Sequence, residues 1–234
     1  MIKPGSKGCH ITHFTKDSKS VTLFWQNRVF ALPGILIQLS LHPMSRQRLY
    51  STIAQEQAWF KIFHGRVPVA LPVGPFRFLN DAKQGECTSG MEKIMNHDTH
   101  ILADIEFMEG KAINNTTIYY VNSGELLLPA CILQPHRFVD TWSDWFGGRR
   151  VRFTDYPDFD KNYGVRSTFA QTKLVNFDDQ IKAYLSYERG WTIEARHHQI
   201  LLYKEDHRIK DELLRPFIQT CQTMVEMFKG NKVL

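Results

Sequence analysis

Apolar and polar residues follow their most regular pattern in the last third of the chain, where they predict a series of elements. Strands are expected at 162–166, 191–195 and 200–204, because β-branched and aromatic residues gather there in short runs. Helices are expected at 176–187 and 213–228, because apolar residues recur there with a helical period. Helices can cover one face of an antiparallel sheet in this β-α-β-β-α order. The sequence therefore predicts an α+β fold, with a mainly antiparallel sheet and helices packed on one face.

The middle of the chain also shows strand patterns separated by polar connections. The expected strands are at 100–107, 116–121, 126–133 and 149–153. A short helix at 138–148 is expected to stop at a pair of glycines, and a turn is expected at 154–160. Upstream, the pattern predicts a helix at 45–63, which Ser45 can cap, and a polar surface loop at 80–98.

Residues 21–41 form the most apolar stretch of the sequence. Polar residues interrupt it, and Pro33-Gly34 would break a helix. The part from Val29 to Leu41 has 13 residues, whereas a membrane-spanning helix needs roughly 20. We therefore expect no spanning helix here. The favoured interpretation is a core strand pair turned at Pro33-Gly34, and a segment at a membrane interface stays open because basic residues flank the stretch.

Charge is spread unevenly along the chain and suggests two parts. Residues 1–85 hold 11 Lys and Arg against 3 Asp and Glu, a net charge of +8, whereas residues 86–234 hold 18 against 21, a net charge of −3. A basic first third is typical of a segment that meets membrane lipid, nucleic acid or an acidic protein, although a solvated basic surface gives the same counts. We expect a basic amino-terminal segment at 1–85 and an α+β module at 86–234, or one continuous domain.

The cysteines and the start of the chain indicate a reducing compartment. The 4 cysteines are widely spaced and none forms a CxxC pair, which argues against a disulfide scaffold and a zinc ribbon. The first residues lack the continuous apolar run of a secretory signal. We therefore expect a cytoplasmic location, either free or peripheral to the inner membrane.

Ten residues of the second module form a recognisable pattern: Leu128, Pro129, Leu133, Pro135, Phe146, Gly147, Pro157, Phe159, Tyr163 and Val165. Through them this part of the chain resembles a family of uncharacterised bacterial proteins, many of which are predicted to be membrane-anchored. These residues resemble the family's LP-x-F-x-L-x-P-E core, its short helix ending in Phe-Gly, and the Pro-containing turn and Phe-x-x-x-Tyr-x-Val strand that follow. The hairpin sequence at 190–204 is similar to the family's Gly-Trp-led hairpin, whereas His136 stands where the family usually has glutamate. The resemblance spans about residues 95–230 and implies a fold and a membrane location, but no activity.

One polar segment carries residue types that bind metals. It contains His97, Asp98, His100 and Asp104. A strand at 100–107 would place His100 and Asp104 on one face, and imidazole and carboxylate groups hold the metal in many hydrolases. A metal-dependent hydrolase using these residues is therefore one hypothesis. Such enzymes take further ligands from elsewhere, and a polar loop entering a strand explains the same residues, so we expect no cofactor.

A second group of residues favours contact with another molecule. Aromatic and basic residues stand together at Trp142, Trp145, Phe146, Arg149 and Arg150. Such residues anchor protein interfaces, and they can also stack on nucleic-acid bases. In the alternative interpretation, the tryptophans dock a short helix on the core while the arginines face water.

These patterns favour a non-catalytic accessory or interaction subunit, held either to a larger complex or to a membrane surface, over an enzyme. The sequence has no G-x-S-x-G, P-loop or G-x-G-x-x-G motif. We expect a protein partner, with peripheral contact to an anionic membrane. Nucleic-acid binding through residues 1–85 is a third hypothesis and is the least favoured.

Overall fold

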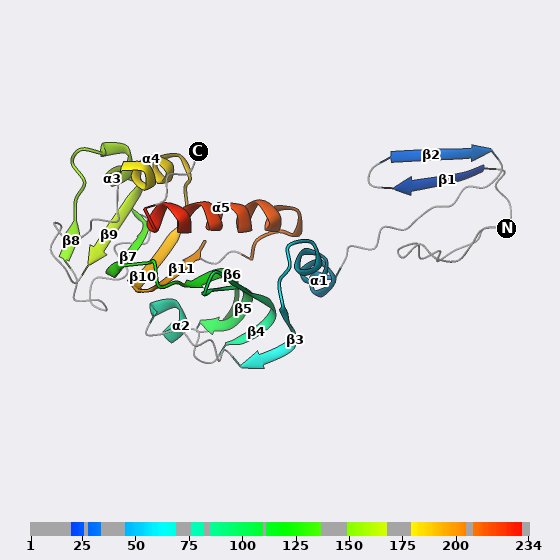
Figure 1. Cartoon of the computed structure of the whole chain (residues 1–234), viewed down its shortest axis with the longest axis horizontal. Helices are drawn as coiled ribbons and strands as arrows, with labels where there is room; N and C mark the ends of the chain where they lie inside the picture. Colours follow the sequence, from blue (N-terminus) through cyan, green and yellow to red (C-terminus); the bar gives the residue numbers. More distant parts are fainter. Residues whose placement is uncertain are drawn as a thin grey trace. The chain divides into compact units, whose positions relative to one another are not determined.

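The computed structural model describes residues 20–25, 28–33, 45–68, 76–81, 85–109, 111–136, 149–167, 179–204 and 208–230 (Figure 1). The chain forms two compact units, residues 1–45 and residues 46–234. In the first unit, β1 (Ser20–Trp25) pairs with β2 (Arg28–Pro33) as a two-stranded antiparallel sheet. A strand pair was expected in this stretch, but the chain reverses between Trp25 and Arg28 rather than at Pro33-Gly34.

The second unit is built on one sheet of nine strands in the order β3-β4-β5-β6-β11-β10-β7-β9-β8. Every pairing in it is antiparallel. The strands are β3 (Lys61–Pro68), β4 (Glu86–Met95), β5 (Asp98–Glu109), β6 (Ala112–Asn122), β7 (Leu128–Pro135), β8 (Arg149–Val151), β9 (Tyr163–Ser167), β10 (Thr192–His197) and β11 (Gln199–Tyr203). This arrangement confirms the predicted α+β fold with a mainly antiparallel sheet.

Helices cover the sheet mainly on one side. They are α1 (Arg46–Glu56), α2 (Arg77–Asp81), α3 (Pro157–Asn162), α4 (Asp179–Tyr187) and α5 (Leu214–Phe228), with a 3₁₀ turn, η3 (Asp211–Leu213), before the last. Figure 1 shows α1, α3, α4 and α5 above the sheet and the short α2 below it. The carboxy-terminal order β9-α4-β10-β11-α5 confirms the predicted β-α-β-β-α pattern.

Strand alternation divides the apolar residues into two cores. Leu102 and Tyr119 belong to the larger core, which includes residues of α1, α4 and α5. Their neighbours Ile101 and Tyr120 belong to the smaller core with Phe78 of α2. Because successive side chains of a strand point to opposite faces, both faces of the middle strands are buried.

Helix α5 lies over the larger core and keeps one face towards it. Its buried side chains include Leu214, Phe217, Ile218, Cys221, Met224, Val225 and Phe228. Pro216 is the third residue of α5 and lies in its first turn, where a missing N–H removes no intrahelical hydrogen bond, so it does not kink the helix.

The helix expected at 45–63 is wrong in its second half, because α1 ends at Glu56. Ala58 has a φ of 55°, and the Trp59 N–H donates to the Ala54 carbonyl over 2.9 Å. This left-handed residue with a backbone bond reaching back over the last turn is a Schellman termination. Such a stop usually carries glycine, so nothing in the residue types marks it, and β3 begins at Lys61, five positions after the end of the helix.

The surface loop expected at 80–98 is also wrong, because β4 occupies most of it. Ser89 and Gly90 made the segment look like a loop, yet both are buried within the strand, as are Cys87 and Met91. The expected turn at 154–160 is interrupted as well, since α3 begins at Pro157, whose fixed φ suits a first helical turn.

The boundary of the sheet unit lies earlier than the expected 85/86 division. Helix α1 and strand β3 belong to residues 46–234, because β3 pairs with β4 along the sheet edge. The helix expected at 138–148 and the start of the one expected at 176 lie outside the described residues. Among the helices of the described residues, none is long and apolar enough to span a membrane.

Candidate functional site

Asp104, one of the predicted metal ligands, is held in a buried ion pair. It lies on β5 with 1% of its side chain exposed, and Arg46 at the start of α1 donates to both of its carboxylate oxygens, over 2.7 and 3.0 Å. The Thr117 hydroxyl on β6 donates to the same carboxylate over 2.6 Å. The carboxylate is therefore saturated by hydrogen bonds from α1 and β6.

The same arginine connects this pair to the segment before α5. Its third guanidinium nitrogen, Nη1, lies 2.7 Å from the Asp211 carboxylate, and the Ile209 N–H donates to the Thr117 hydroxyl. Burial lowers the pKa of Arg46, but the hydrogen bonds and the electrostatic attraction from Asp104, Tyr50 and Asp211 together outweigh burial and hold the pKa above its ordinary value. We call Arg46, Asp104, Thr117 and Asp211 the Arg46 clasp.

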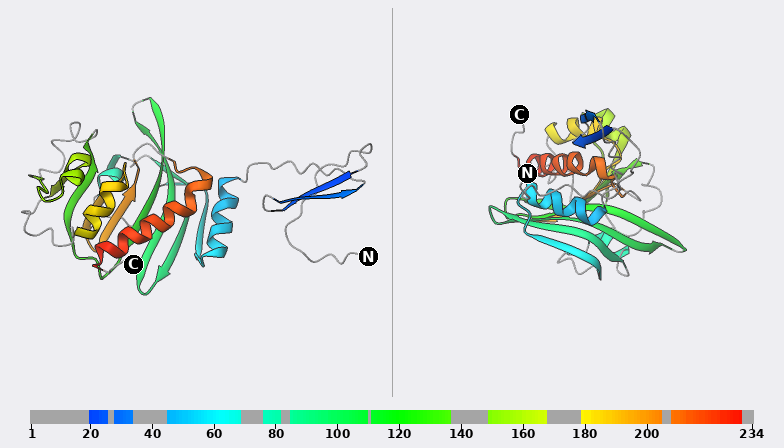
Figure 2. Two further views of the ribbon diagram at one scale, coloured as in Figure 1. Left: turned by 90° about the horizontal axis from the view of Figure 1, so that it is seen from above. Right: turned by 90° about the vertical axis from the view of Figure 1, so that its right-hand side faces the viewer.

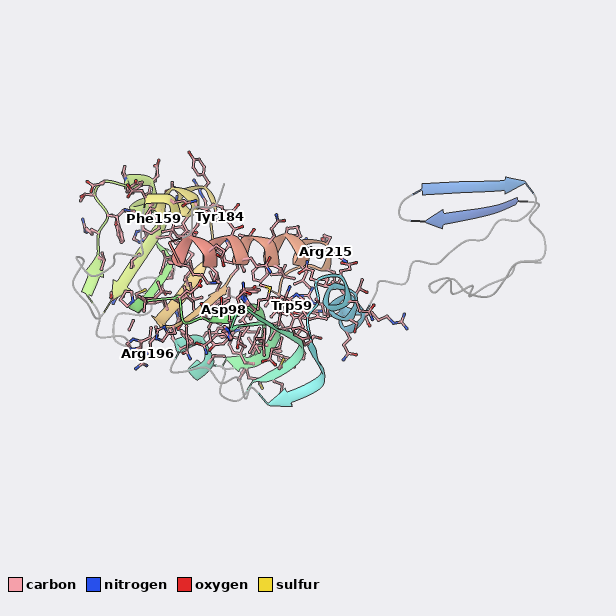
Figure 3. The ribbon with its side chains drawn as sticks, in the orientation of Figure 1. Trp59, Asp98, Phe159, Tyr184, Arg196 and Arg215 are labelled. Carbon is pink, nitrogen blue, oxygen red and sulfur yellow. The ribbon has the colours of Figure 1, made fainter. Side chains whose placement is uncertain are left out.

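Asp98 and His100 are held at the other end of β5. Asp98 is labelled in Figure 3. Its carboxylate lies 2.6 Å from the Lys229 ammonium group just past α5, and both side chains are under a tenth exposed. His100 shares a 3.0 Å hydrogen bond with the Tyr119 hydroxyl, and burial lowers the pKa of His100 to about 4. The imidazole is therefore neutral at pH 7.

The structure does not bring the four predicted metal ligands together. Asp98, His100 and Asp104 lie on one face of β5, as alternation predicts, but six residues of strand put Asp98 and Asp104 roughly 20 Å apart. His97 is exposed in the turn before β5, with a φ of 71°. Within the described residues there is no group of three or more His, Cys, Asp or Glu side chains that could hold a metal ion.

Glu194 is a fully buried carboxylate that sequence analysis missed. It lies on β10 and accepts hydrogen bonds from the backbone N–H groups of Arg77 and Phe78, over 2.6 and 3.0 Å, and from the Tyr203 hydroxyl, over 2.8 Å. Burial raises the pKa of Glu194. The contacts fix the start of α2 on the smaller core. The available signal was an acidic residue alternating with apolar ones in a predicted strand.

The predicted interaction cluster lies mostly outside the described residues. Trp142, Trp145 and Phe146 lie outside the described residues. Arg149 and Arg150 belong to β8, the last strand of the sheet. The cluster stays a prediction, and β8 places its two arginines at a sheet edge.

A surface groove lies next along the chain, between α3 and α4. Its volume is about 480 Å³. Its lining includes Asp155, Tyr156, Asp158, Lys161, Asn162, Ser186, Tyr187 and Arg189. A volume of this size is typical of sites for small molecules.

The walls of the groove are tied together by side chains of the two helices. The Asn162 amide donates to the Ser186 carbonyl over 3.2 Å, joining the ends of α3 and α4. The Lys182 ammonium group lies 4.3 Å from the centre of the Tyr156 ring and pairs with Asp179 over 2.9 Å. The groove is therefore preformed.

An exposed apolar pair lies at the end of the β5–β6 hairpin. Met108 and Ile113 are opposite each other across the two strands and are 64% and 62% exposed. The neighbouring strands do not reach this far: β4 pairs with β5 only up to Glu106, and β11 pairs with β6 only from Ile118. Figure 2 shows the hairpin extending past its neighbours. We call residues 107–113 the hairpin tip.

Comparison with known proteins supplies a structural likeness only. No protein-family model matches the chain, and no curated protein matches it. Among solved structures, the crystal structure of the mycobacterial trehalose monomycolate transport factor A, TtfA, superimposes with a TM-score of 0.54 at 9% sequence identity. The match covers 79% of this chain and 92% of that one. At this identity the likeness shows a shared fold.

Proposed function

We propose that this chain is a non-catalytic accessory protein that binds a protein partner in a larger, membrane-associated assembly. The observation that carries the proposal is the hairpin tip. It displays two large apolar side chains, Met108 and Ile113, beyond the ends of the neighbouring strands. Both are exposed, and neither belongs to the two cores of the sheet unit.

The tip has the properties of a docking element. Burying Met108 and Ile113 against a partner would contribute about 1.5–3 kcal/mol for each side chain if burial were complete. The outer backbone edges of residues 107–109 and 112–116 pair with no further strand among the described residues, so a partner strand can also add there. Apolar contact and strand addition together suit a protein partner better than a small molecule.

Two further observations support the accessory role. The fold resembles that of a protein whose structure is described as a transport factor. The first third of the chain carries a net charge of +8, which suits contact with an anionic membrane surface or an acidic partner. By contrast, the carboxylates of the hydrolase hypothesis are each paired with a cation, Asp98 with Lys229 and Asp104 with Arg46.

Site-specific photo-crosslinking in the native cell tests the proposal. A photoreactive amino acid replaces Met108 in one variant and Ile113 in another. Leu127, which is 70% exposed in the connection between β6 and β7, is the control. We expect one defined adduct from both tip positions and none from the control. The adduct is then identified with and without mild detergent to separate membrane from soluble partners.

A binding variant completes the test. Met108→Lys places a charge on the tip and should lower recovery of the crosslinked partner in affinity purification at least about tenfold. Leu127→Lys is the matched control and should leave recovery unchanged. A protein that elutes alone from its native source, with no tip adduct and no affinity for anionic vesicles, would overturn the proposal.

A further inference from the structure

The groove between α3 and α4 has no part in the proposed partner contact and carries its own chemistry. Its lining joins donors and acceptors of both signs: Asp155 and Asp158 supply carboxylates, and Lys161 and Arg189 supply cations. Tyr156 and Tyr187 add aromatic rings at its sides.

The balance of charge limits what the groove can bind. Two carboxylates face two cations, so a strongly anionic ligand and a free cation each meet as much repulsion as attraction. A wholly apolar ligand would strip water from these polar groups without replacing their hydrogen bonds. A neutral ligand with many donors and acceptors satisfies both conditions.

Planar side chains define the ligand further. Asp158, Asn162 and Arg189 present pairs of coplanar oxygen or nitrogen atoms, which match neighbouring hydroxyl groups two at a time. Tyrosine has an apolar ring face and a polar hydroxyl, and Tyr187 lines the groove with 87% of its surface exposed, so its ring is open to a ligand. Sugar rings combine vicinal hydroxyls with an apolar C–H face, which is the complement of this lining.

We propose that the groove binds a neutral saccharide of about one or two sugar units, either free or as the headgroup of a glycolipid. The 480 Å³ volume accommodates a ligand of that size. Asp158 and Asn162 on α3 accept and donate to the hydroxyls, Arg189 donates from the end of α4, and Tyr187 covers the C–H face. The Asn162–Ser186 hydrogen bond holds the two helices at a fixed distance, so binding requires no closure.

Saturation-transfer NMR on the full-length protein tests the proposal with free maltose, sucrose and trehalose as probes. We expect transfer to sugar ring protons in the wild type. Tyr187→Ala should weaken binding about fivefold to tenfold. Phe60→Ala removes another exposed aromatic residue, 74% exposed and outside the groove, and should leave the signal unchanged.

The source of the saccharide is resolved by a second experiment with vesicles. Phosphatidylcholine vesicles with and without a diglucosyl lipid are sedimented with the wild type and Asp158→Asn. Retention only by the glycolipid vesicles, lost in the variant, assigns the headgroup; transfer to free sugars without such retention assigns soluble saccharide. Both outcomes support the proposal.

No transfer to any probe sugar and no preference for glycolipid vesicles would overturn it. So would a signal that Tyr187→Ala leaves intact, because the sugar would then bind elsewhere. If Tyr187→Ala instead reduced recovery of a protein partner, the groove would be a peptide site. Tip crosslinks at Met108 are independent of these results, so a failed saccharide site leaves the accessory role standing.

Discussion

Asp104 is held by a charge from a distant part of the chain. Arg46 lies 58 positions earlier in the sequence and reaches Asp104 only because α1 packs over the sheet. The spacing along β5 predicts that Asp104 and His100 share a face, whereas the opposite charge that makes Asp104 part of the clasp comes only with the fold.

Removing the charge of Asp104 should be strongly destabilising. In Asp104→Asn the guanidinium of Arg46 stays buried without its principal counter-charge, and the loss should be about 3–5 kcal/mol of unfolding free energy. Urea unfolding measures this loss of unfolding free energy. Glu56→Gln is the control: it breaks an ion pair with Arg215 whose side chains are 49% and 45% exposed, and it should cost less than about 1 kcal/mol of unfolding free energy. Equal losses in the two variants would contradict the buried role of the clasp.

His100 should make stability fall with acidity. The folded protein keeps the pKa of His100 at about 4 through burial, whereas the unfolded value is near 6.5. The unfolded chain therefore binds the proton first, so this contribution is complete above pH 6.5 and is lost as the pH falls towards 4. The loss is on the order of 3 kcal/mol.

Urea unfolding from pH 7 to pH 4 checks this with His100→Gln, which keeps a hydrogen-bonding group near Tyr119 without a titrating one. The difference in unfolding free energy between the wild type and His100→Gln should shrink as the pH falls from 6.5 towards 4. The hydrogen bond from Lys229 helps hold the pKa of Asp98 below its ordinary value, so Asp98 keeps its contribution to stability through most of this window and loses it only as the pH falls below about 4. A constant difference would show that His100 titrates normally.

At the scale of elements, the helices and strands with a regular apolar period were the ones that the sequence predicted correctly. The β10–β11 hairpin and α5 were predicted because their apolar residues keep a strand or helix period over the whole element. Strand β4 was missed because Ser89 and Gly90 are buried by packing against neighbouring strands rather than by their own hydrophobicity. The groove was not predicted for a similar reason, because α3 and α4 are separate in sequence and come together only in the fold.

The short helix α2 should depend on one carboxylate. Glu194→Gln replaces an acceptor oxygen by an amide nitrogen, which then faces an N–H group of Arg77 or Phe78 or the Tyr203 hydroxyl. We expect a loss of about 2 kcal/mol and faster hydrogen exchange at the first amides of α2. Tyr203→Phe removes a single hydrogen bond and should cost only about 1 kcal/mol. Unchanged exchange in Glu194→Gln would show that α2 is held by its apolar contacts alone.

At the scale of the whole molecule, the sheet unit should fold without the first unit. Each strand of the nine-stranded sheet and each described residue of the two cores lies within residues 46–234. A fragment of residues 45–234 should therefore unfold at the same urea concentration as the full chain. A loss above about 2 kcal/mol would mean that residues 1–44 contribute to the core of the larger unit.

The sequence defined the larger unit only in part. Charge placed a division near residue 85, whereas the sheet recruits α1 and β3 and moves it to 45/46. Net charge reports what a surface attracts and not which segments pair, because strand pairing joins residues by backbone hydrogen bonds regardless of their sign.

The Arg46 clasp also governs how the molecule bears mechanical load. Arg46 is the first residue of the sheet unit, so tension on residues 1–45 enters at a side chain locked to Asp104 in β5 and to Asp211 before α5. Single-molecule pulling through the amino terminus should therefore need a higher rupture force in the wild type than in Asp104→Asn. Force applied through residues 1–45 therefore reaches β5 through the clasp, instead of unwinding α1 turn by turn.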